Sequence, residues 1–173
     1  KRGDFVESEM SKLLLDADAP AIILNALLEY APDRKTVVFV PGVEFAHLLA
    51  AHFQQHGIAA EAIDGGMASD LRRDVLARLH SGETSVVVNC MILTEGFDLP
   101  SLSCIVVARP TKSKSLYIQM IGRGTRLHPG KVDCLILDLV GASEQHDLMT
   151  IPTLFGLPPK KLKNKTLLAA IQE

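Results

Sequence analysis

Five short runs of mostly apolar residues constrain the fold of this 173-residue chain more than any other feature. Most are rich in β-branched residues and lack the polar–apolar alternation of a strand with one face in water. Such runs are typical of strands buried on both faces, as in a parallel sheet covered by helices. The predicted strands span residues 36–40, 58–64, 84–89, 103–110 and 132–140.

Helical patterns separate these runs. They cover residues 19–33, 42–57, 70–82 and 113–124. Ser69 is a candidate N-cap of the third helix. Gly57 and Gly82 are expected to end the second and third helices. The alternation predicts an α/β fold, a parallel sheet flanked by helices on both faces. Ligands of such folds bind at the carboxyl ends of the strands. We therefore expect the chemistry to follow Val40, Asp64, Asn89, Pro110 or Asp138.

Composition excludes several classes of protein. Hydrophobic residues make up 47% of the chain, and the formal net charge is -2. These values argue against disorder and against a uniformly basic nucleic-acid coat. No run approaches the roughly 20 apolar residues of a membrane span. The cysteines Cys90, Cys104 and Cys134 form no CxxC pair, which favours reduced thiols and a cytoplasmic location.

The stretch QMIGRGTRLHPGK, residues 119–131, carries two arginines three positions apart in a glycine-rich turn. Arg123 and Arg126 can point to the same side, and each guanidinium presents a planar fork of donors. Gly122 and Gly124 allow the backbone to approach a ligand closely. This arrangement suits a phosphate, in particular the terminal phosphate of a nucleotide. The alternative is a solvated arginine pair at a helix end.

Two other stretches have residues suited to nucleotides or phosphodiesters. In TEGFDLP, residues 94–100, Asp98 could accept from a ribose hydroxyl, although an ordinary polar loop is the alternative. Gly65 and Gly66 precede the helix that carries Arg72 and Arg73, and one of these arginines could contact a phosphodiester. Solvation of a polar helix face is the alternative there.

The order of these stretches resembles the later motifs of superfamily 2 helicases, from about Thr36 to Leu139. The match is most specific at Gln119, Gly122, Arg123 and Arg126. Gln119 and the TEGFD loop resemble DEAD/DEAH-box-like DNA helicases and restriction-type translocases. RNA-directed DEAD-box proteins usually have His at the position of Gln119, so the resemblance favours DNA over RNA as the partner.

The resemblance implies a RecA-like fold and specific roles. Arg123 and Arg126 match arginine fingers, which the second motor domain supplies to ATP and Mg²⁺ bound mainly on the first domain of the same polypeptide. The ATP-contacting positions would be Gln119, Gly96, Asp98 and Gly122. The nucleic-acid-contacting positions would be Thr94, Gly66 and Arg72.

Several motifs of a complete ATPase are missing from the sequence. No GxxxxGK[ST] phosphate loop occurs, because Gly124 and Gly130 are one residue too far apart and Val132 replaces the magnesium-binding hydroxyl. Lys131 is therefore expected to be a surface or interface charge, and Asp138 a strand-end residue. His52 and His56 could share a metal, but no third ligand is evident, so we expect no metal site.

We therefore expect residues 1–18 to be a linker from a missing first motor domain. Residues 19–155 would form the helicase C-terminal domain, and residues 156–173 a linker and the start of a further helix. The expected function is the second half of a helicase that does not hydrolyse ATP alone. A stand-alone nucleic-acid-binding or interaction module is the alternative. A small-molecule enzyme is a third possibility, although no GxGxxG follows a strand.

Overall fold

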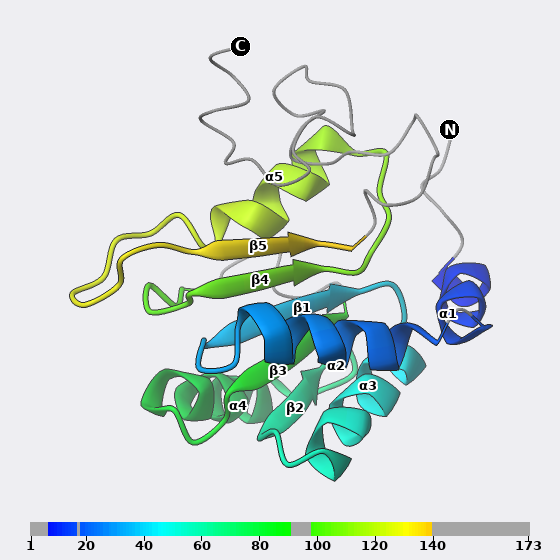
Figure 1. The fold of residues 1–173 in the computed structure, drawn as a ribbon, viewed down its shortest axis with the longest axis horizontal. Coiled ribbons are helices and arrows are strands. Elements are labelled where there is room, and N and C mark those ends of the chain that lie inside the picture. The colour runs from blue at the N-terminus through cyan, green and yellow to red at the C-terminus, as the bar shows by residue number, and fades with distance from the viewer. Residues whose placement is uncertain (1–6, 17, 91–97, 140–173) are drawn as a thin grey trace.

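A five-stranded parallel sheet lies between two layers of helices (Figure 1). The computed structural model describes residues 7–16, 18–90 and 98–139. The strand order is β2-β3-β1-β4-β5, and every pairing is parallel. The strands are β1 (Thr36–Val40), β2 (Ala60–Ile63), β3 (Val86–Cys90), β4 (Cys104–Val107) and β5 (Leu135–Asp138). The predicted α/β class is confirmed.

Each central strand is buried on both faces, which explains its uniformly apolar sequence. In β1, Val38 and Val40 belong to the core shared with α2 (Ala19–Tyr30) and α3 (Val43–Gln55). The alternate residues Val37 and Phe39 belong to the core shared with α4 (Ser69–Ser81) and α5 (Lys114–Gly122). Side chains of a strand alternate between its two faces, so each face must be apolar where helices cover both.

A helix that the sequence analysis did not predict precedes this fold. It is α1 (Glu7–Asp16), within the stretch expected to be a linker, and it contacts α2. Its Leu14 packs against the α2–α3 side of the core.

The helix ends follow the predicted glycines, but one predicted cap is wrong. Gly57 and Gly82 have φ values of +79° and +87° just after α3 and α4, a conformation that favours glycine. Ser69 does not cap α4. Ala68 holds the N-cap position, and its carbonyl already accepts the N–H of Arg72 at 3.1 Å, so the helix starts one residue earlier than expected.

A polar cluster joins β2, α4 and the start of β3. Both Glu61 carboxylate oxygens accept from Arg78, at 2.8 Å from Nε and 2.7 Å from Nη2. The hydroxyl of Thr84 donates to the same carboxylate at 2.5 Å. The Arg78 hydrogen bonds lower the pKa of Glu61, partial burial opposes them, and Thr84 adds to the lowering. The charged carboxylate therefore stabilises the folded state.

This cluster makes stability depend on pH in a defined window. Because the folded-state pKa of Glu61 is lowered, its contribution is present above the unfolded pKa of about 4.3. The contribution is lost as the pH falls through the folded-state pKa. We expect Glu61→Gln to lower the urea midpoint of unfolding at pH 7, and the difference from wild type to shrink below about pH 4. A difference that stays constant from pH 7 to pH 3 would contradict this assignment.

Candidate functional site

The arginine turn, residues 122–131, lies at the amino ends of β4 and β5 (Figure 1). Helix α5 starts after the carboxyl end of β4, where the hydroxyl of Ser113 caps it by accepting from the N–H of Leu116 at 3.2 Å. The helix then runs back along the sheet and ends at Gly122. The expectation that the chemistry follows the carboxyl ends of the strands is therefore wrong for this turn, because a helix between parallel strands returns the chain to the opposite edge.

Asp98 and Arg126 form an ion pair at this edge. Asp98 belongs to the segment before β4, whereas Arg126 follows α5, so the fold brings two separate stretches together. The side chains retain 61% and 46% of their exposure, so both remain accessible to a ligand. The predicted ATP-contacting acid and one predicted finger are thus direct neighbours.

The other predicted residues of α5 lie close by. Arg123 is half-buried at the C-cap of α5, and Gln119 is exposed one turn earlier on the same helix. Gly122 has open space where a side chain would lie, with nothing within 4 Å of a Cβ built there. The chain itself therefore does not require glycine at this position.

Gly124 differs from Gly122, because its neighbours leave no room for a side chain. A Cβ at Gly124 would overlap the sulfur of Cys134 and lie 3.0 Å from Cδ1 of Ile105. The backbone of the arginine turn thus packs directly on β4 and the residue preceding β5. Burial raises the pKa of the Cys134 thiol, which keeps the neutral form at this contact.

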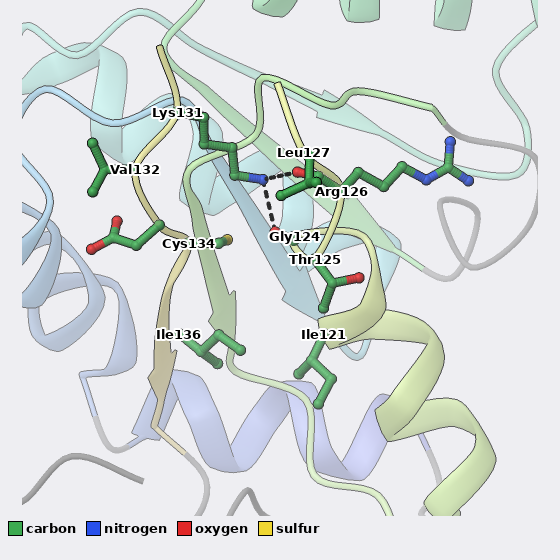
Figure 2. A pocket seen from close by; sticks show the side chains of 10 residues that line it. Ile121, Gly124, Thr125, Arg126, Leu127, Lys131, Val132, Cys134 and Ile136 are labelled. Atoms are coloured by element: carbon green, nitrogen blue, oxygen red, sulfur yellow. Dashed lines mark hydrogen bonds between the residues drawn. The ribbon is translucent and has the colours of Figure 1, made fainter. Parts of the chain in front are cut away.

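The sequence predicts a surface or interface charge at Lys131, and in the structure this side chain is half-buried with three backbone partners. Its ammonium donates to the carbonyls of Gly124 at 2.7 Å, Arg126 at 2.9 Å and Pro100 at 3.2 Å. Figure 2 shows Lys131 reaching the backbone of the arginine turn, beside a cavity of about 280 Å³, while the Arg126 side chain extends away. The sequence did not predict these partners, because all three acceptors are backbone atoms, which no side-chain pattern reveals.

Two of the predicted nucleic-acid contacts, Gly66 and Arg72, lie at the opposite edge of the sheet. Gly66 is exposed after the carboxyl end of β2, and its N–H donates to Oδ1 of Asp64 at 2.7 Å. Nε2 of His47 lies 2.7 Å from the other oxygen of Asp64 and is the main cause of that carboxyl's lowered pKa. The Gly66 amide is therefore already used within the turn.

Arg72 and Arg73 differ in their surroundings. Arg73 is exposed and pairs with Asp70 on its own helix at 2.5 Å, whereas Arg72 is half-buried. Of the two, Arg73 is the one with a carboxylate partner on its own helix, and Arg72 is the one predicted to contact nucleic acid. Thr94 and Gly96, the remaining predicted site residues, lie outside the described residues.

Sequence reasoning missed several buried polar groups. Arg109, two residues after the end of β4, retains 5% of its exposure, and Asn89 is fully buried in β3. The hydroxyl of Tyr117 donates to Asp138 at 2.8 Å, so α5 is tied to the last residue of β5. A basic residue near the end of the apolar run predicted at 103–110 was the available indication for Arg109.

The histidine pair gives no metal centre in the part of the chain that the structure describes. Nδ1 of His56 lies 2.8 Å from the backbone oxygen of His52, and no group of three or more His, Cys, Asp or Glu suited to a metal occurs among these residues. Within the same residues, no helix has the length and apolar character needed to cross a membrane.

The two glycines of the turn allow a matched comparison. Gly124→Ala should destabilise the fold by about 1–3 kcal/mol, because the new methyl overlaps Cys134 and the neighbours must shift. Gly122→Ala should leave stability unchanged or slightly raised, because alanine favours helix and meets open space. Urea unfolding of both variants measures the difference, and equal stabilities would show that the Gly124 contact is unimportant.

The helicase conserved C-terminal domain family matches residues 19–128. IRC3 of Saccharomyces cerevisiae, named as a candidate ATP-dependent helicase, is 38% identical over 159 residues, covering 89% of this chain and 23% of that protein. A mitochondrial protein of the same name in Schizosaccharomyces pombe is 40% identical over 160 residues, covering 90% of this chain and 26% of the relative. The chain thus spans about a quarter of these relatives.

Solved structures agree with the fold. The C-terminal domain of the DEAD-box protein Dbp5 gives a TM-score of 0.61 at 20% identity, covering 71% of this chain and 70% of that one. A fragment of an HsdR subunit of a type I restriction enzyme from Vibrio vulnificus gives 0.60 at 25% identity, covering 73% and 27%. This chain therefore belongs to the helicase conserved C-terminal domain family and has the RecA-like fold of superfamily 2 helicases.

Proposed function

We propose that this domain is the second motor domain of an ATP-dependent DNA helicase or translocase, and that it supplies Arg123 and Arg126 as fingers to ATP on a preceding domain. The observation that carries the proposal is the exposed Asp98–Arg126 pair beside the end of α5. A guanidinium and the carboxylate that we propose for ribose binding thus lie together on one accessible edge. Without a phosphate loop of its own, this edge is suited to completing a nucleotide site built elsewhere.

The residues at this edge fit a nucleotide. Arg126 has an exposed guanidinium, Arg123 lies three residues earlier at the C-cap of α5, and the open space at Gly122 admits close approach of a phosphate. The first domain would hold most of the ATP and Mg²⁺, and hydrolysis would break the bond to the terminal phosphoryl group of this ATP. Arginine fingers in related systems accelerate that step by roughly 10³–10⁵.

The ion pair must open when ATP binds. Asp98 is proposed to accept from the ribose and Arg126 to reach the terminal phosphate, and these groups lie at opposite ends of the nucleotide. An exposed ion pair contributes only about 0–1 kcal/mol, so a triphosphate can readily replace Asp98 as the partner of Arg126. The observed Asp98–Arg126 ion pair would then be the arrangement of these side chains before the nucleotide binds.

The surface around the turn suits an interface with the preceding domain. Leu127 and Val132 are 95% and 98% exposed within the arginine turn and just after it. Large apolar side chains that are fully exposed beside a functional group are typical of a contact surface. We propose that the N-terminal RecA-like domain of the same polypeptide covers them.

The opposite edge would hold the nucleic acid. Arg72, with Gly66 and Thr94, is proposed to contact the phosphodiester backbone, and Gln119 supports DNA rather than RNA through its resemblance to DNA-directed enzymes. The cytoplasmic location stays a prediction, since the relative from S. pombe is named as mitochondrial.

Removing either finger should nearly abolish ATP turnover in the full-length protein. We expect Arg123→Ala and Arg126→Ala to lower kcat by roughly 10³-fold or more, because transition-state charge is left unneutralised. Binding of single-stranded DNA should persist. Lys12→Ala, which removes an exposed positive charge on α1, is the control. Normal turnover in both finger variants would reject the assignment.

Removing Arg72 should weaken nucleic-acid binding. In salt titrations of single-stranded DNA binding, Arg72→Ala should reduce the slope of log Kd against log salt by about 1, as expected for one lost phosphate contact. Arg73→Ala removes the same charge from a side chain already paired with Asp70, so its effect should be smaller. Equal effects of the two variants would mean that only overall charge matters at this edge.

A further inference from the structure

We infer that Lys131 is a positioning residue, which clips the arginine turn to the segment that carries Asp98. This inference rests on the finger role proposed above and extends it to a side chain outside the helicase motif. Lys131 would hold the backbone of the arginine turn at a fixed distance from the segment that carries Asp98, whether or not the two side chains are paired.

The three hydrogen bonds of Lys131 account for all the donors of an ammonium group. Two acceptors, the carbonyls of Gly124 and Arg126, belong to the arginine turn, and the third, at Pro100, lies two residues after Asp98. A single side chain thus joins both segments that contribute the pair. Because its donors are engaged, Lys131 acts on the protein backbone in this arrangement and does not reach a phosphate.

A tight turn aims Lys131 at these carbonyls. The N–H of Lys131 donates to the carbonyl of His128 at 3.0 Å, and Gly130 has a φ of +81°. Proline followed by glycine at positive φ is the pattern of a type II turn. The side chain that leaves this turn is half-buried, so its four-carbon stem packs over the cavity of Figure 2 while its charge is satisfied.

The hydrogen bonds of Lys131 fix the position of the backbone that carries the Arg126 side chain. The Lys131 ammonium fixes the Arg126 carbonyl directly, and the Gly124–Cys134 contact fixes the turn two residues earlier. Arg126 itself is 46% exposed, so its side chain has little packing to restrain it. Its reach towards a phosphate therefore depends on the position of this backbone.

The test uses the full-length protein with three variants. Lys131→Met keeps the stem and removes the donors. Lys131→Arg keeps the charge, but its donors lie in a planar fork and cannot reproduce three hydrogen bonds that one nitrogen donates in different directions. Lys12→Met, on exposed α1, is the matched control for a lost lysine charge.

We expect Lys131→Met to lower kcat for DNA-stimulated ATP turnover on the order of 10²-fold, as for a catalytic group displaced by about 1 Å. The KM for ATP should change little, and Lys131→Arg should retain most of the defect. In the Arg126→Ala background, Lys131→Met should add almost nothing, because both changes remove one function. Additive losses, or full recovery with Lys131→Arg, would overturn the inference.

Hydrogen exchange separates this inference from the finger proposal. The amides of residues 124–131 should exchange faster in Lys131→Met than in wild type or in Lys12→Met. Unchanged exchange would reject the clip even if Arg126 proved to be a finger. Normal turnover in Arg126→Ala would instead reject the finger, whereas faster exchange in Lys131→Met would still support the clip.

Discussion

The contact between the bare backbone of Gly124 and the sulfur of Cys134 seats the arginine turn on the edge of the sheet. The proposed role of Arg126 as a finger depends on this contact, because the arginine lies two residues further along an exposed turn. Lys131 also holds this turn, through the carbonyls of Gly124 and Arg126, and links it to the carbonyl of Pro100. The packing contact and the hydrogen bonds of Lys131 together fix the position of the backbone that carries Arg126, whose side chain remains accessible.

The two proposed binding surfaces lie at opposite edges of one parallel sheet. Asp98 and Arg126 lie before the amino ends of β4 and β5, whereas Gly66 and Arg72 follow the carboxyl end of β2. A rigid sheet between these surfaces gives them a fixed relative position. In the proposed motor, ATP at one edge and nucleic acid at the other could thus be coupled by movement of the domain as a body.

The fold class and the positions of the strands along the chain were predictable, because apolar β-branched runs separated by helical patterns are compatible with few other folds. The run at Thr36–Val40 matches β1 residue for residue. The edge at which the arginines lie was predicted wrongly, since the general rule for α/β folds concerns carboxyl ends and α5 carries the chain back. The role of Lys131 depends on backbone carbonyls from two segments, and the use of the Gly66 amide by Asp64 depends on turn geometry. Sequence patterns record neither.

As a finger, Arg126 would bind the charge that develops in the transition state more strongly than it binds ATP. The most direct measurement compares the affinity of full-length wild type and Arg126→Ala for a non-hydrolysable ATP analogue and for ADP with aluminium fluoride. We expect the variant to lose far more affinity for the transition-state mimic than for the ground-state analogue. Equal losses for both ligands, or no loss for either, would contradict this role.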